Sequence, residues 1–183
     1  SKRDNPMKAI VQIPLTQASA YHEAGHAVAA WHVGLTPTAI SLCPDADYLA
    51  YVEHQAPFKK HDDPQYDQQP GDQERAMLTA IVSLAGPIAQ KRHRARSYRN
   101  GHGMADRLQA LELAELFCET EDECRAWVKL CQLRAERTVQ LLWPAIQSVA
   151  SATLENNGYA DAELIEKAIK SAMDGIQMLP KDR

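Results

Sequence analysis

The sequence predicts a mainly α-helical fold with a small β-hairpin or sheet. Most of the chain places apolar residues at helical spacing. Two short runs, 38–42 and 48–54, instead alternate apolar and polar residues and carry β-forming types. A chain of 183 residues, 45% of them hydrophobic, is long enough to bury one compact core.

Start and stop signals divide the chain into five expected helices. Thr16 can cap the first helix and Gly34 can end it, while Asp161 can cap the last. We expect helices over 16–32, 72–94, 105–117, 122–155 and 161–173. Gly86-Pro87 is expected to kink or break the second, and Pro144 to bend the fourth. Residues 56–71 and 97–103 are expected to be loops, and 156–158 a turn.

Composition excludes several functional classes. The net charge is −4, and the basic cluster at 91–99 is best interpreted as a solvated helix end rather than a nucleic-acid surface. The longest apolar stretch, 76–89, is too short to span a membrane, and the N-terminus does not resemble a signal peptide. Cys43, Cys118, Cys124 and Cys131 form no CxxC pair, which predicts free thiols in a reducing cytoplasm.

Residues 22–26 read His-Glu-Ala-Gly-His, an HExxH motif. On a helix, His22 and His26 lie on one face about 6 Å apart along the axis, where both imidazoles can reach one zinc ion. Glu23 is offset by one residue and can activate a water on the metal as a general base. Alanines surround the motif, so buried polar groups here need partners, and the sequence predicts a Zn²⁺ site.

A catalytic zinc site needs a third protein ligand. His32 has metzincin spacing, but Ala29 stands where that pattern needs glycine, and a continuing helix turns His32 away. Glutamates of later helices are a second source, and Asp106, which opens the helix after a glycine-containing loop, is a third. Those glutamates are Glu74, Glu112 and Glu115. Spacing alone leaves this choice open.

Three segments resemble the peptidase domain of FtsH-like zinc metalloproteases. Residues 20–31, Ala-Tyr-His-Glu-Ala-Gly-His-Ala-Val-Ala-Ala-Trp, are similar to the metal-binding helix of that family. Residues 84–89, Leu-Ala-Gly-Pro-Ile-Ala, and 103–110, Gly-Met-Ala-Asp-Arg-Leu-Gln-Ala, are similar to two later family segments. The C-terminal segments 134–137, 141–146 and 157–158 are also similar to the family.

The resemblance implies a helical zincin fold like that of the FtsH peptidase, with His22, His26 and Asp106 as zinc ligands and Glu23 as general base. The chain departs from the family pattern at Gln90 and Lys91, where family members usually carry glutamates. It also contains no phosphate-binding loop of an ATPase. We therefore expect one domain over 1–183, with a metal-binding part at 16–117 and a C-terminal helical part at 118–175.

The expected function is ATP-independent zinc metallopeptidase activity on flexible or unfolded polypeptides. The alternatives are a non-catalytic, zinc-stabilised module that binds peptides or proteins, and a zinc hydrolase of non-peptide amides. Substrate is expected to pair with the strand at 49–53, His102 can stabilise an oxyanion, and the loop at 56–71 can act as a lid. The expected partners are a peptide or unfolded protein substrate, and either further copies of the chain in a homo-oligomer or a separate partner protein that can present substrate.

Overall fold

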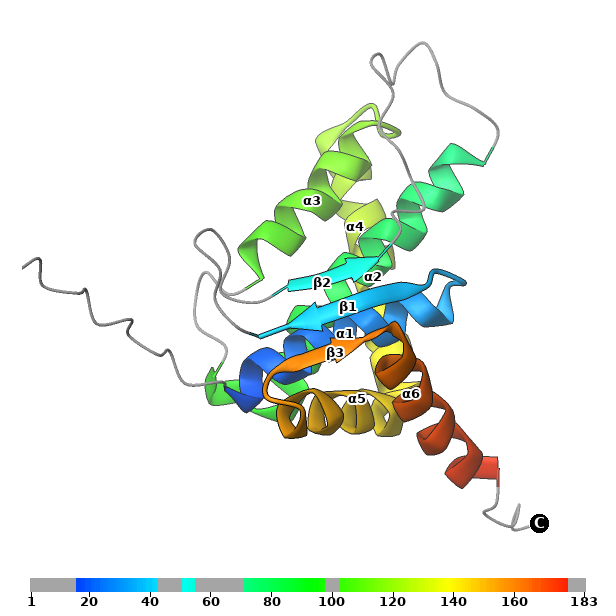
Figure 1. Cartoon of the computed structure of the whole chain (residues 1–183). Helices are drawn as coiled ribbons and strands as arrows, with labels where there is room; N and C mark the ends of the chain where they lie inside the picture. The colour runs from blue at the N-terminus through cyan, green and yellow to red at the C-terminus, as the bar shows by residue number, and fades with distance from the viewer. Residues whose placement is uncertain (1–15, 43–50, 55–70, 98–102, 178–183) are drawn as a thin grey trace, which may run out of the picture.

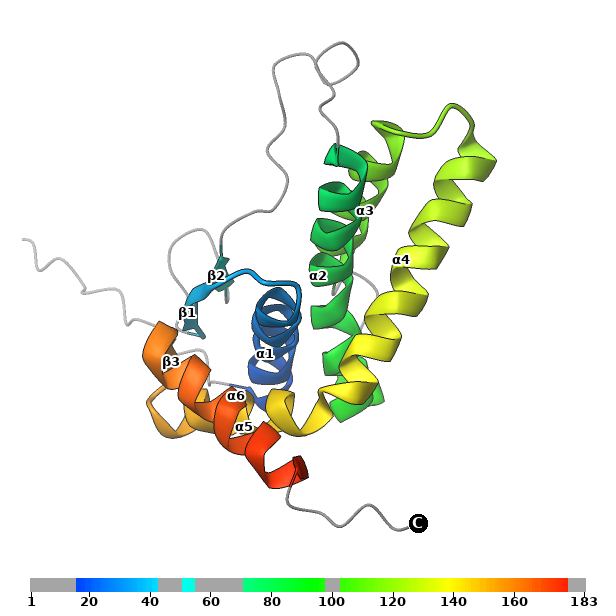
Figure 2. The same cartoon turned by 90° about the vertical axis from the view of Figure 1, so that its right-hand side faces the viewer.

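The computed structural model describes residues 16–42, 51–54, 71–97 and 103–177. It confirms the predicted class, because the described residues are mainly helical with one small sheet (Figures 1 and 2). The helices are α1 (Gln17–His32), α2 (Asp72–His93), α3 (Met104–Glu115), α4 (Glu121–Leu141), α5 (Trp143–Glu155) and α6 (Ala162–Gln177), with a short 3-10 helix η1 (Ala95–Ser97). The strands are β1 (Pro37–Ser41), β2 (Tyr51–His54) and β3 (Tyr159–Asp161).

The sheet has three antiparallel strands in the order β2-β1-β3. The predicted hairpin is present, with Ile40 of β1 opposite Val52 of β2. The third strand was not predicted: β3 follows the expected turn directly and places Ala160 opposite Ile40. Three residues are too few to show alternation, so β3 owes its extended form to pairing with β1. Asp161 still caps α6, since its Oδ1 accepts from the Leu164 N–H at 2.9 Å.

The two internal prolines affect the helices differently. α2 runs from Asp72 to His93 without a break at Pro87. Pro87 removes the N–H that would donate to the Ser83 carbonyl, and this turn of the helix is buried. Pro144, by contrast, separates two helices: α4 ends at Leu141, and Pro144 lies in the first turn of α5, where its missing N–H costs nothing.

α1 lies at the centre of the fold, between the sheet and the other helices (Figure 2). Thr16 caps it as predicted, with its hydroxyl oxygen accepting from the Ser19 N–H at 3.1 Å. Small residues allow α2 to approach closely: a Cβ at Gly25 would stand 2.7 Å from the Ala89 Cβ and 2.8 Å from the Ala85 oxygen. The bare backbone at Gly25 therefore sets the α1–α2 distance, which positions everything that the two helices share.

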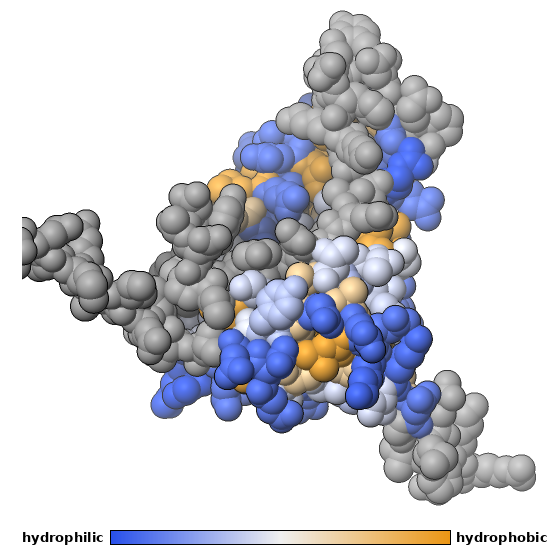
Figure 3. Space-filling model, in the orientation of Figure 1, coloured by the Kyte–Doolittle hydropathy of each residue, from blue (hydrophilic) through white to orange (hydrophobic). Residues whose placement is uncertain are grey.

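Two apolar clusters support this arrangement. One gathers residues of α1, β1, α5 and α6, the other gathers residues of α3 and α4, and α2 contributes to both. Each cluster contains residues of both the predicted metal-binding part, 16–117, and the predicted C-terminal helical part, 118–175. On the surface, Met104 and Leu108 of α3 are 55% and 50% exposed, and apolar atoms are visible over this helix (Figure 3).

Two further predictions concern the cysteines and membrane-spanning helices. Cys118, Cys124 and Cys131 are free thiols, as expected, while Cys43 lies outside the described residues. Within the described ranges, no helix is both long and apolar enough to cross a membrane.

Candidate metal centre

Three predicted ligands from two distant parts of the chain meet between α1 and α3. His22 and His26 lie one turn apart on α1, and Asp106 lies in the first turn of α3, after Gly103 takes a left-handed conformation with φ of 70°. One ligand atom from each residue lies within 4.8 Å of the other two. Among the described residues this is the one group of three or more such side chains, so the structure provides a possible metal-binding triad.

The spacing of the donor atoms fits a small metal ion. The two Nε2 atoms of His22 and His26 are 3.1 Å apart. Asp106 straddles the pair, with Oδ2 3.4 Å from His22 Nε2 and Oδ1 3.4 Å from His26 Nε2. Ligands at 2.0–2.1 Å from a tetrahedral zinc are separated by about 3.3 Å. The nitrogen pair therefore has the separation that two zinc ligands need, and the carboxylate can approach through either oxygen.

A backbone carbonyl fixes the orientation of the His26 ring. His26 Nδ1 lies 2.9 Å from the carbonyl oxygen of Val82 on α2. A carbonyl can only accept, so Nδ1 carries the proton and Nε2 of the neutral ring presents a lone pair to the centre. Metal-binding histidines are typically held in this way by an acceptor behind the ring.

Gln90 of α2 fixes the orientation of the His22 ring, as the Val82 carbonyl does for His26. Its Oε1 lies 3.0 Å from His22 Nδ1, while its Nε2 donates to the Ser97 carbonyl at 3.4 Å. The second bond leaves Oε1 as the atom that faces the ring, so His22 also turns a lone pair inward. In the sequence, Gln90 was recognised only as a departure from the family pattern. Its position one residue after Ala89, on the face of α2 that packs against α1, was the available signal.

Burial and mutual attraction govern the charges of the triad. Burial lowers the pKa of His22, but the hydrogen bond to Asp106 and the charges of Glu23 and Asp106 outweigh it, and the pKa is raised overall. Burial likewise raises the pKa of Asp106, yet the hydrogen bond to His22 and the charges of both histidines hold it below its usual value. In the metal-free chain these shifts favour a proton between His22 and the ionised Asp106. A bound cation would replace that proton and meet two ring nitrogens and a carboxylate.

Glu23 lies beside this centre on α1 and is 7% exposed. Burial, with a contribution from the negative charge of Asp106, raises its pKa to about 7, against an opposing effect of His22. A carboxyl group that titrates near neutrality can accept a proton and return it within one reaction cycle. Glu23 therefore has the properties of a general base next to the triad.

The other predicted candidates lie elsewhere. His32, at the last turn of α1, is exposed and does not belong to the triad, and neither do the three exposed glutamates that competed as ligands, Glu74, Glu112 and Glu115. The candidate substrate strand is described from Tyr51 onward as β2, and Leu49 lies outside the described residues. His102 and the loop at 56–70 also lie outside them.

No model of a known protein family matches this chain, and no curated protein is significantly similar to it. The resemblance to the FtsH-like peptidase domain therefore stays a prediction from sequence motifs. The geometry of the site carries the functional proposal.

Proposed function

We propose that this protein is a zinc metallopeptidase in which His22, His26 and Asp106 hold the metal and Glu23 is the general base. The observation that carries the proposal is the combination of a convergent triad with a buried carboxyl group whose pKa is about 7. A purely structural zinc site has four closed protein ligands and needs no neighbouring base. Three ligands and a base are the parts of a hydrolytic site.

The donor set fits zinc and is shared with one other class of metal. Two imidazoles and one carboxylate are common zinc ligands in hydrolases, and they also bind non-haem iron in oxygenases. Glu23 favours the hydrolase, because oxygen activation at iron does not require a general base at the metal. When bound, zinc would lower the pKa of a water in the open position and polarise a substrate carbonyl.

Different residues of this chain would then have different roles in the hydrolysis. Glu23, as carboxylate, accepts a proton from the attacking water and, once protonated, donates it to the leaving amine. Val82 and Gln90 hold the two histidines in the tautomer that faces the centre. Because the base is buried, its proton is not lost to bulk solvent between the two transfers.

The sheet supports peptides as the substrate class. Among the described strands β2 pairs on one side only, with β1, and it packs against α1, which carries the motif (Figure 1). An extended peptide can add to such an edge through its backbone amides. We propose this binding mode, which selects flexible or unfolded polypeptides because a folded chain does not offer an extended strand. The site and its edge strand also support the proposed kinship with FtsH-like peptidases.

Hydrolysis of an unfolded substrate tests the proposal. The zinc-loaded protein and Glu23→Gln would be incubated with reduced, carboxymethylated casein, and new amino termini would be measured by fluorescence labelling. Gln keeps the volume of Glu but cannot accept a proton, so we expect loss of cleavage by at least about 100-fold. Gln140→Glu, a change at an exposed position of α4, provides a control for handling and fold.

Zinc content distinguishes the outcomes. Equal zinc in both proteins with cleavage only in the wild type supports the peptidase. Equal zinc with no cleavage of casein or of unstructured peptides by either protein would favour the non-catalytic binding module. Cleavage that persists in Glu23→Gln would show that another group is the base.

A further inference from the structure

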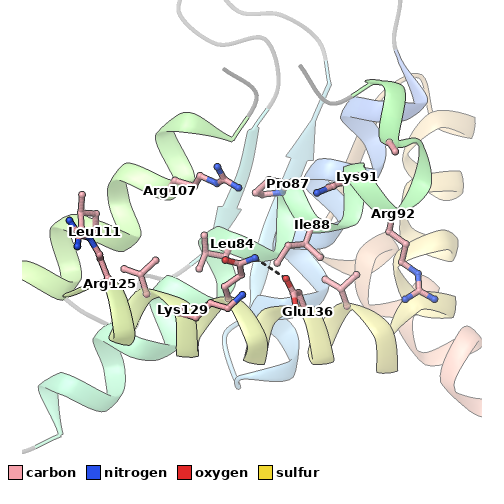
Figure 4. Close-up of a pocket in the computed structure, with 14 residues that line it drawn as sticks. Leu84, Pro87, Ile88, Lys91, Arg92, Arg107, Leu111, Arg125, Lys129 and Glu136 are labelled. Carbon is pink, nitrogen blue, oxygen red and sulfur yellow. Dashed lines mark hydrogen bonds between the residues drawn. The ribbon is translucent and has the colours of Figure 1, made fainter. Parts of the chain in front are cut away.

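A second concave site lies between α2, α3 and α4. It is a cavity of about 820 Å³ that includes Leu84 and Ile88 of α2, Leu111 of α3 and Val128 of α4 (Figure 4). None of His22, Glu23, His26 and Asp106 lines it. Its volume is within the range of sites that take small organic molecules, roughly 300–1,000 Å³.

The floor of the cavity is aliphatic. Leu84 and Val139 are buried, and Ile88 and Val128 are half-buried beside them. Among the described residues that line the cavity, none is aromatic. A flat ligand such as a nucleobase would find no ring to stack on, whereas an alkyl chain gains free energy from any apolar wall.

The rim of the cavity is cationic. Five basic residues line it, against one carboxylate among the described lining residues; they are Lys91, Arg92, Arg107, Arg125 and Lys129. The carboxylate is that of Glu136, which accepts from Gln132 Nε2 at 2.8 Å. The basic cluster that the sequence shows after residue 90 thus contributes to a cavity rather than only to a solvated helix end.

Three of these cations are available to a ligand. Arg125 already pairs with Glu121 and Asp122, and Arg92 lies over the Trp143 ring at 4.7 Å. The other three, Lys91, Arg107 and Lys129, make no ion pair within the described ranges. Each comes from a different helix, and in Figure 4 Arg107 and Lys91 lie on either side of Pro87. An anion at the mouth would meet cations from α2, α3 and α4.

We propose that this cavity binds an aliphatic carboxylate of fatty-acid type, with its alkyl chain on the Leu84–Val128 floor and its carboxylate at the Arg107–Lys129 rim. The aliphatic floor selects the chain and the unpaired cations select the head group. The proposal is independent of the metal centre and of its chemistry, because the two sites share no lining residue.

Calorimetric titration of the intact protein with butanoate, decanoate and dodecanoate tests the proposal, at concentrations below micelle formation. We expect one binding site and an affinity that rises by up to about fourfold for each methylene that enters the cavity. Decyltrimethylammonium has a similar chain and the opposite charge, so it should bind at least about tenfold more weakly than decanoate.

Variants distinguish binding of decanoate in the cavity from nonspecific binding of an amphiphile elsewhere on the protein. Arg107→Gln combined with Lys129→Gln should weaken decanoate binding by about tenfold, and Ala95→Trp should block the cavity with a side chain at its lining. Arg137→Gln removes an exposed cation of α4 that does not line the cavity and should bind decanoate like the wild type. Circular dichroism would show that each variant is folded.

Three results would overturn the proposal. These are no saturable binding of any carboxylate, equal binding of decanoate and decyltrimethylammonium, and equal binding by folded Ala95→Trp and wild type. The combination of chain-length dependence, preference for the anion and loss in Ala95→Trp would establish the site.

Discussion

Gly86 of α2 lies directly against the imidazole of His26, so that a Cβ built on Gly86 would overlap the ring at Nε2, the atom that faces Asp106. The missing side chain is therefore what allows His26 to hold both Val82 and the triad. In this position glycine is a requirement of the proposed metal centre.

Gly86→Ala is expected to abolish zinc binding. Alanine favours a helix interior by about 1 kcal/mol over glycine, so any loss must come from the displaced His26 ring. Competition with a chelating indicator would measure the zinc affinity. Gly34→Ala is the control, because Gly34 has a φ of 85°, which strains a substituted residue, yet nothing lies within 4 Å of the added carbon. Unchanged affinity in Gly86→Ala would contradict the observed packing.

Gln90→Ala is expected to weaken zinc binding by about 10–100-fold, the usual effect of removing an acceptor behind a metal-binding histidine. Gln90→Glu keeps an acceptor oxygen for His22 Nδ1 and should retain tight binding. The same indicator competition, with Gln140→Ala at an exposed position of α4 as control, checks both. If Gln90→Ala and Gln90→Glu lost affinity equally, Gln90 would act through packing and not through His22.

The metal-free protein should lose stability as pH rises toward neutrality because of Glu23. Its pKa is about 7 in the folded chain against an ordinary value of 4.5, so the folded state binds the proton more tightly than the unfolded state does. Stability is therefore lost as pH rises from about 4.5 through 7, by up to roughly 3 kcal/mol. Glu23→Gln cannot ionise and should escape this loss.

Urea unfolding of the metal-free wild type and Glu23→Gln at several pH values would test this. We expect the two free energies of unfolding to be similar near pH 4 and Glu23→Gln to be the more stable near pH 8. A pH-independent difference would show that the Glu23 carboxyl does not titrate in this range in the folded protein.

Local features of the fold were predictable from the sequence because they depend on neighbouring residues. Thr16 caps α1, Asp161 caps α6, and the alternating runs form β1 and β2, as their residue types indicate. The HExxH motif likewise places His22 and His26 on one face of a single helix.

The parts that were missed depend on tertiary contacts. β3 is a strand because β1 pairs with it, and α2 continues through Pro87 because neighbouring elements bury that turn. At the site, spacing could not choose Asp106, since its contact with His22 joins residues 84 positions apart in the chain, the difference between 106 and 22. The Val82 acceptor is a backbone carbonyl, which no residue type identifies.

Zinc stoichiometry tests the central claim most directly. Wild type, Asp106→Ala and the control Asp161→Ala would be saturated with zinc, dialysed against buffer without metal and measured by elemental analysis. We predict one zinc per chain in the wild type and in Asp161→Ala, and little or none in Asp106→Ala, because two histidines alone do not complete the site. A wild-type protein without zinc, or an Asp106→Ala protein that keeps it as tightly, would contradict the proposed centre.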